Sequence, residues 1–127
     1  MEKEKKAKIL IVEDDPFLSS MYITKLEKSG YETLACEDGQ KGWELVQEEK
    51  PDLVLLDILL PKMSGFEVLK QMKASSEHKD IPIILLTNLG QKSDVDEGLK
   101  LGAVDYLIKA HFTPTEVVRK IEKALKT

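Results

Sequence analysis

The sequence has a single cysteine, no long apolar run and no excess of basic residues, and each shortage excludes a class of protein. Cys36 is the one cysteine among 127 residues, which excludes an internal disulfide and a zinc site built on several cysteines. The longest apolar stretches, 53–60 and 81–86, fall far short of the roughly 20 residues that span a bilayer. Lysine and arginine number 19 against 23 acidic residues, which argues against electrostatic binding of nucleic acid. No secretory signal is evident, so we expect a cytoplasmic protein that contacts neither membrane nor nucleic acid directly.

The length fits one domain of ordinary size. The sequence is 42% hydrophobic and 33% charged, which is typical of a globular protein. It contains no linker, internal repeat or low-complexity tract. We therefore expect residues 1–127 to form a single domain, with a core from about residue 8 to residue 125 and no output domain.

Short runs of isoleucine, valine and leucine alternate with helix signals along the chain. The runs predict buried strands and lie at 9–12, 53–56, 81–86 and 104–108, with a weaker one at 32–36. Capping residues and prolines predict helix starts at Asp15-Pro16, Asp38, Ser64, Ser93 and Thr113-Pro114. This alternation predicts an α/β fold: a doubly wound parallel sheet of five strands with five helices on its two faces. His78 falls in a polar loop and shows no partner.

The carboxyl ends of the predicted strands bring acids, a hydroxyl and an amine to one edge of the sheet, where α/β proteins bind ligands. These residues are Glu13, Asp14, Asp57, Thr87 and Lys109. Three close carboxylates raise one another's pKa or require a cation, and oxygen ligands suit Mg²⁺ better than a transition metal. The metal, the lysine and the hydroxyl could then hold an anion. This combination indicates phosphoryl transfer, with a carboxylate as the nucleophile.

In combination, these segments closely resemble the receiver domain of two-component response regulators, of the chemotaxis-regulator kind. The resemblance covers nearly the whole chain, and its motifs lie at 9–16, 51–57, 60–65, 83–87 and 102–109. It implies a flavodoxin-like sheet with the strand order 2-1-3-4-5.

The resemblance also implies roles for single residues. Asp57 would accept a phosphoryl group from a sensor histidine kinase or a phosphotransfer protein. Asp14, Asp57 and the backbone carbonyl of Leu59 would bind Mg²⁺, with Glu13 acting through water. Lys109 would pair with the phosphoryl oxygens.

The resemblance further implies a conformational switch. Thr87 would move to hydrogen-bond the phosphoryl group, and Tyr106 would change rotamer with it. The surface formed by the fourth helix, fifth strand and fifth helix would change and signal to a protein target, and it is also the expected homodimer face. On this interpretation the chain is a signalling switch rather than an enzyme, although it assists its own phosphorylation and slow dephosphorylation.

Four further positions bear on how this chain compares with the receiver pattern that it resembles. Ala110 follows Lys109 where the family usually has proline, and a non-proline cis bond costs ~3 kcal/mol, so we expect a trans bond there. We interpret His111 as an ordinary loop histidine. In receivers, the residues two positions beyond the acceptor and the switch hydroxyl flank the path of an attacking water, and the resemblance places Leu59 and Leu89 there. Because neither can orient water, we expect a long-lived phosphorylated state.

Three alternative functions were weighed against this one. A haloacid-dehalogenase phosphatase needs a second acid two residues after its nucleophile, where this chain has Leu59. A flavodoxin-like binding module needs a phosphate loop after the first strand, where the acids 13–15 would repel a flavin phosphate. A receiver that serves only as a scaffold would lack a key residue, and none is missing.

Overall fold

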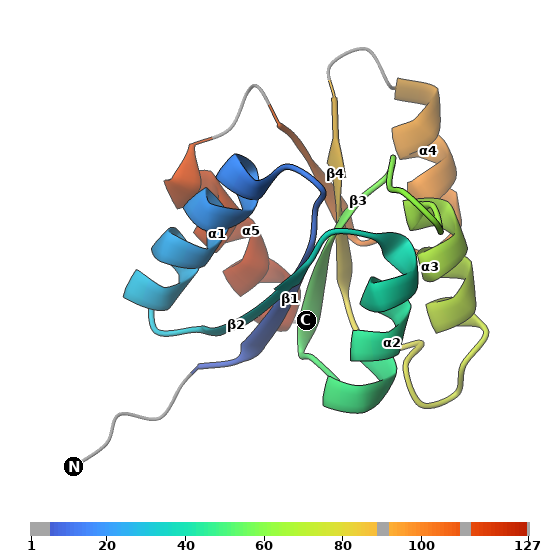
Figure 1. The fold of residues 1–127 in the computed structure, drawn as a ribbon, viewed down its shortest axis with the longest axis horizontal. Coiled ribbons are helices and arrows are strands. Elements are labelled where there is room, and N and C mark those ends of the chain that lie inside the picture. The colour runs from blue at the N-terminus through green and yellow to red at the C-terminus, as the bar shows by residue number, and fades with distance from the viewer. Residues whose placement is uncertain (1–5, 89–91, 110–112, 127) are drawn as a thin grey trace.

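The computed structural model describes residues 6–88, 92–109 and 113–126, so the predictions about Leu89, Ala110 and His111 lie outside the described residues. Within these ranges strands and helices alternate five times, as the sequence predicts (Figure 1). The elements are β1 (Lys8–Val12), α1 (Pro16–Lys28), β2 (Glu32–Cys36), α2 (Gly39–Glu49), β3 (Leu53–Asp57), α3 (Gly65–Lys73), β4 (Ile83–Thr87), α4 (Lys92–Lys100), β5 (Asp105–Ile108) and α5 (Pro114–Lys126).

The strands form one parallel sheet in the order β2-β1-β3-β4-β5, which confirms the predicted fold and strand order. Helices α1 and α5 cover one face, and α2, α3 and α4 cover the other (Figure 1). The register aligns Val12 with Leu56, Asp57 with Leu86, and Thr87 with Ile108. The carboxyl ends of four strands therefore lie along the same edge.

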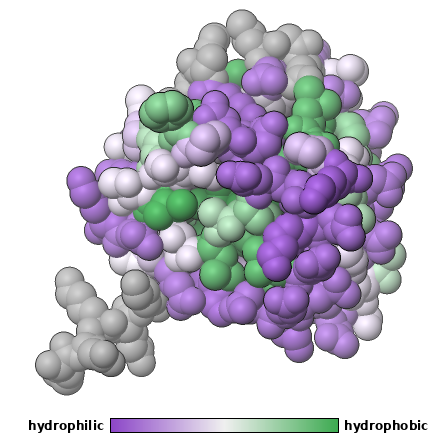
Figure 2. All heavy atoms as spheres, in the orientation of Figure 1, coloured by the Kyte–Doolittle hydropathy of each residue, from purple (hydrophilic) through white to green (hydrophobic). Residues whose placement is uncertain are grey.

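The hydrophobic core has two parts, one on each face of the sheet. Alternate residues of β1, β3 and β4 pack against α1 and α5, and the residues between them pack against α2 and α3. These strands are buried on both faces, which explains their continuous apolar sequences. Figure 2 shows further hydrophobic side chains between α1 and α2, over the edge strand β2. Among the described residues, no helix is long and apolar enough to cross a membrane.

Most of the predicted helix starts are confirmed by hydrogen bonds. Asp15 Oδ1 accepts from the Phe17 amide (2.9 Å), and Asp38 Oδ1 accepts from the Lys41 amide (2.7 Å). Ser64 Oγ accepts from the Glu67 amide (3.2 Å). Thr113 and Glu116 cap each other reciprocally, at 3.3 and 3.2 Å. These side chains satisfy amide groups that a helix start leaves unpaired.

Three predictions of local structure were wrong. Ser93 does not precede α4, because that helix begins at Lys92 and places Ser93 inside its first turn. β4 begins at Ile83 rather than residue 81, since Pro82 has no amide hydrogen to donate to a ladder. β5 begins at Asp105 rather than residue 104.

His78 also differs from expectation, because its polar loop folds back onto α2. Its side chain is buried, with Nδ1 2.7 Å from Ser75 Oγ. Its ring lies edge-on to Trp43 with 5.6 Å between ring centroids. Ser75 lies three residues before His78 in the same loop, whereas Trp43 lies on α2, far away in the sequence, so the sequence did not reveal the ring contact.

Candidate functional site

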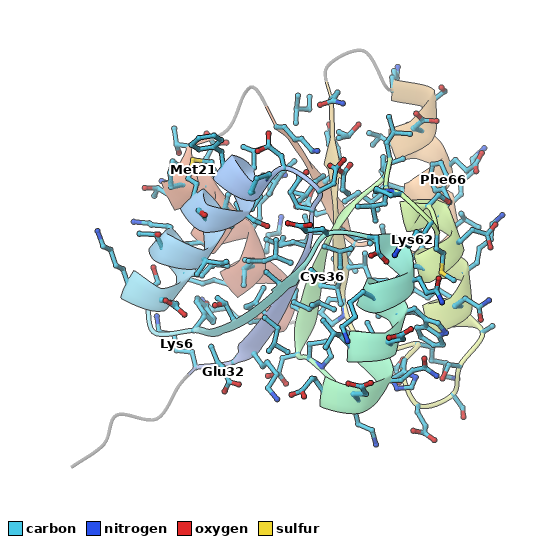
Figure 3. The ribbon with its side chains drawn as sticks, viewed as in Figure 1. Lys6, Met21, Glu32, Cys36, Lys62 and Phe66 are labelled. Atoms are coloured by element: carbon cyan, nitrogen blue, oxygen red, sulfur yellow. The ribbon has the colours of Figure 1, made fainter. Side chains whose placement is uncertain are left out.

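Three carboxylates meet where β1 and β3 end. Glu13 directly follows β1 and continues the sheet, because its amide donates to the Cys36 carbonyl at the end of β2 (3.1 Å; Cys36 is labelled in Figure 3). Glu13 and Asp57 are buried, whereas Asp14 is exposed. One carboxylate oxygen from each of the three lies within 4.8 Å of the others. The structure thus brings together the three acids that the sequence placed at strand ends.

Lys109 joins two of these acids from the end of β5. Its Nζ atom lies 2.7 Å from Asp57 Oδ2, and 2.9 and 3.1 Å from the two carboxylate oxygens of Glu13. The Lys109 amide donates to the Thr87 carbonyl (2.8 Å), which extends the β4–β5 pairing. The ammonium therefore lies between the two buried carboxylates.

Burial controls the protonation of this cluster. Burial raises the pKa of Glu13 to about 7; the hydrogen bond from Lys109 lowers this pKa and the nearby Asp57 charge raises it. Burial alone would lower the pKa of Lys109, but its hydrogen bonds to Asp57 and Glu13 outweigh burial and raise it. One lysine faces three acids, so the cluster favours an additional cation.

The donor atoms of the three acids are of the kind that binds a magnesium ion. All three donors are carboxylate oxygens, which Mg²⁺ prefers, and exposed Asp14 leaves room for the water that Mg²⁺ usually retains. Glu13 Oε1 is buried and receives no hydrogen bond of good geometry from the described residues, although Lys109 lies near it. The Leu59 amide donates to Asp57 Oδ1 (3.2 Å), so the backbone of Leu59 lies beside the Asp57 carboxylate.

The loop from β3 to α3, which carries Leu59, is anchored at both ends. The amide of Gly39 at the start of α2 donates to the Pro61 carbonyl (3.3 Å), and Lys62 lies 3.8 Å from Asp38 (Lys62 is labelled in Figure 3). At the other end, a Cβ atom on Gly65 would lie 2.2 Å from the Asp57 carbonyl oxygen. Only glycine permits that approach, so α3 begins directly against the backbone of Asp57.

Thr87 and Tyr106 occupy different positions relative to the acids. Thr87 is buried at the end of β4, between the strands of Asp57 and Lys109, and its hydroxyl donates to the Asn88 carbonyl (3.3 Å). Tyr106 pairs with Leu85, two residues before Thr87 on β4, and is 36% exposed. The mouth of the site is a depression lined by Glu13, Asp14, Asp15, Leu18, Asn88 and Lys109.

The sequence analysis overlooked one residue that contacts Tyr106. Lys120 of α5 contacts both Asp105 and Tyr106. Its place in the amphipathic sequence of α5 resembles that of any solvent-facing lysine. The alternation of charged and apolar residues therefore gave no signal for this contact.

Comparisons with known proteins agree with this geometry. The family described as the response regulator receiver domain matches residues 9–122. The DNA-binding dual master transcriptional regulator RpaA of Synechocystis sp. is 39% identical over 119 residues, which are 94% of this chain and 49% of that protein. The chain spans about half the length of the curated relatives it matches.

Two solved structures share the fold along almost their whole length. A response-regulator structure from Chloroflexus aurantiacus is 32% identical with a TM-score of 0.91, covering 97% of this chain and all of that one. The receiver domain of a sensor histidine kinase from Pseudomonas aeruginosa is 27% identical with a TM-score of 0.86, covering 95% of this chain and 98% of that one. That second structure contains a magnesium ion coordinated in its active-site cleft.

Proposed function

The chain belongs to the response regulator receiver domain family, and from this premise we propose that it accepts a phosphoryl group on Asp57 in a magnesium-dependent reaction. The donor is a sensor histidine kinase or a phosphotransfer protein. The observation that carries this assignment is the contact of Lys109 Nζ with Asp57 Oδ2 at 2.7 Å, beside the carboxylates of Glu13 and Asp14. In this position the side chain of Asp57 has a cation on one side and further metal ligands on the other.

The chemistry assigns the nucleophile to Asp57. A carboxylate oxygen of Asp57 attacks phosphorus, the bond from phosphorus to the donor's imidazole nitrogen breaks, and the imidazole keeps the electron pair of that bond. Mg²⁺, held by Asp14, Asp57 and the backbone carbonyl of Leu59 with Glu13 acting through water, would neutralise charge on the phosphoryl oxygens. Lys109 pairs with the same oxygens, and its contact with Asp57 supports this role.

The consequence of phosphorylation is a change of surface. Thr87 moves to donate its hydroxyl to the phosphoryl group, and Tyr106 rotates into the space beside it. The surface of α4, β5 and α5 then signals to a protein target, and it also serves as a homodimer face. Three large hydrophobic side chains are exposed on these elements and on the connection to β5: Leu99, Val104 and Tyr106. Their exposure supports a protein-binding role.

We further propose that the chain acts as a cytoplasmic signalling switch and not as an enzyme with an external substrate. The domain core extends from about residue 8 to residue 125. Its net charge of −4 disfavours direct nucleic-acid contact by this domain. The likeness to chemotaxis regulators stays a prediction.

Intact-mass measurement after incubation with Mg²⁺ and acetyl phosphate tests the proposal. We expect one labile phosphoryl adduct on the parent chain and none on Asp57→Asn. The matched control is Asp52→Asn. Asp52 is an exposed acid that directly precedes β3, and its carboxylate accepts a hydrogen bond from the Lys8 amide. Full labelling of Asp57→Asn would contradict the assignment, and phosphate release without any adduct would favour a phosphatase.

A further inference from the structure

At the outer edge of β5, two side chains form hydrogen bonds with the backbone of Tyr106. β5 is the last strand of the sheet, so one side of its backbone lacks a neighbouring strand. At Tyr106 the amide donates to Asp105 Oδ1 (2.8 Å), and the carbonyl accepts from Lys120 Nζ (2.9 Å). Both backbone groups of Tyr106 at this edge therefore have partners, which protects the edge from pairing with another strand.

Lys120 also holds the ring of Tyr106. Its Nζ atom lies 2.9 Å from Asp105 Oδ1 and 5.4 Å from the centroid of the Tyr106 ring. The ion pair and the carbonyl contact hold the ammonium at two points of the same strand, since Asp105 and Tyr106 both belong to β5. The ammonium is thus a fixed cation over the ring face, a favourable cation–π arrangement.

These contacts distinguish between two orientations of Tyr106. If the ring rotates inward, the backbone of β5 stays in register, so Lys120 keeps its bonds to Asp105 and to the Tyr106 carbonyl. The cation–π contact is lost, because the ring leaves the ammonium. Lys120 therefore stabilises the surface orientation of the ring and contributes nothing comparable to the inward one.

We propose that Lys120 is a positioning residue that holds Tyr106 at the surface and so sets how readily the phosphorylation switch operates. This inference rests on the rotation of Tyr106 stated under the proposed function. A group that stabilises one of two orientations weakens the binding of any ligand that favours the other orientation. Removing the cation should therefore raise the inward population of Tyr106 and strengthen binding of a phosphoryl mimic.

The size of the effect follows from the exposure of the pair. A cation–π contact at an exposed site corresponds to about a two- to fivefold shift in an equilibrium. Lys120→Met should raise the ratio of inward to surface Tyr106 by that factor. It should also lower the concentration of beryllium fluoride needed for half-saturation, in the presence of Mg²⁺, by the same factor.

Fluorine NMR of protein labelled with 3-fluorotyrosine measures both quantities. Tyr106→Phe assigns the Tyr106 resonance among the three tyrosines. Lys120→Arg keeps a cation and should behave like the parent chain. Lys123→Met is the matched control, because Lys123 lies beside the same surface groove of α5. Among the described residues, no ion pair or ring contact joins Lys123 to Tyr106.

The outcomes separate this inference from the proposed function. If beryllium fluoride does not move the Tyr106 resonance of the parent chain, the rotation itself is wrong, and the role of Lys120 is overturned with it. If the parent resonance moves but Lys120→Met matches the parent at rest and in affinity, only the role of Lys120 is wrong. Equal effects of Lys120→Met and Lys123→Met, or of Lys120→Met and Lys120→Arg, would also overturn it, because the cation over the ring would not be the cause.

Two checks complete the experiment. Thermal melting verifies that each variant is folded before its spectrum is compared. Sedimentation at the NMR concentration verifies that parent and variants share one oligomeric state. A change in oligomeric state without a change in the Tyr106 equilibrium of the monomer would contradict the positioning role.

Discussion

Lys109 Nζ lies 2.7 Å from Asp57 Oδ2, although the two residues are 52 positions apart in the sequence. The pair forms because one strand, β4, separates β3 from β5, and all three strands end at the same edge. The two side chains are 13% and 4% exposed, so each charge depends on the other for compensation. Several measurable consequences depend on this buried pair and on the acids around it.

Replacing Lys109 should destabilise the fold as well as impair labelling. Lys109→Met leaves Asp57 and Glu13 buried without their cation, and breaking such a pair costs about 3–5 kcal/mol. Because Glu13 can take up a proton, we expect the free energy of unfolding to fall by about 3 kcal/mol at pH 7, the lower end of that range. Labelling by acetyl phosphate should also be slower. Urea unfolding measures the first effect, with exposed Lys100→Met as the control. Unchanged stability of Lys109→Met would show that the pair is not buried as described.

The raised pKa of Glu13 predicts how stability depends on pH in the absence of metal. The folded chain holds this proton with a pKa of about 7, against an ordinary value of 4.5. The folded state therefore binds more protons than the unfolded state between these values, and Glu13's contribution to stability must fall as pH rises from about 4.5 to 7. We expect a loss of about 1–3 kcal/mol over this window. Glu13→Gln should flatten this dependence in urea titrations at pH 5, 6 and 7, and an identical slope in both proteins would contradict it.

Neutralising Asp14 should separate metal binding from stability. In the parent chain, Mg²⁺ at 100 times its dissociation constant should stabilise the fold by about 2.7 kcal/mol. Asp14→Asn should abolish that gain and, by relieving repulsion among the acids, raise metal-free stability by about 0.5–1 kcal/mol. Thermal melts with and without Mg²⁺ test both effects, with exposed Asp80→Asn as the control. A variant that melts lower without metal and still responds to Mg²⁺ would place the site elsewhere.

The lifetime of the phosphorylated chain should depend on Leu59. Leu59 is 55% exposed and its backbone amide contacts Asp57, but its apolar side chain cannot hydrogen-bond an attacking water. Leu59→Asn should speed first-order decay of the phosphorylated chain in excess Mg²⁺ by about tenfold, which corresponds to ~1.4 kcal/mol of barrier. Initial labelling should be unchanged, and Leu99→Asn, remote from Asp57, should decay like the parent chain. Leu89→Glu tests the same idea at the second position. Equal or slower decay in all the Leu59 and Leu89 variants would show that water access there does not limit hydrolysis.

Much of the fold and the site was predictable because parallel strands leave a strong signal. Strands buried on both faces must be continuously apolar, and their carboxyl ends must share an edge, so Glu13, Asp57 and Lys109 were expected together. The strand order, in contrast, came from the family resemblance. The start of β4 could have been predicted from Pro82, which has no amide hydrogen to donate, whereas the capping pattern at Ser93 misplaced the start of α4.

The contacts that could not be predicted join segments that are distant in the sequence. His78 meets Trp43 only because its loop folds back onto α2. Lys120 reaches Tyr106 only because α5 packs beside β5 at one particular register. Amphipathic periodicity places each of these residues on a helix face or in a loop, but it does not identify the side chain opposite.

Chemical trapping of the phosphorylated residue tests the central claim most directly. Sodium borohydride reduces an aspartyl phosphate to homoserine, which peptide mass mapping locates in the sequence. After treatment with acetyl phosphate and Mg²⁺, we predict homoserine at position 57 and at no other acid, and none when the metal is chelated. Homoserine at a different acid, or its complete absence from a chain that carries the phosphoryl mass, would contradict the assignment of Asp57.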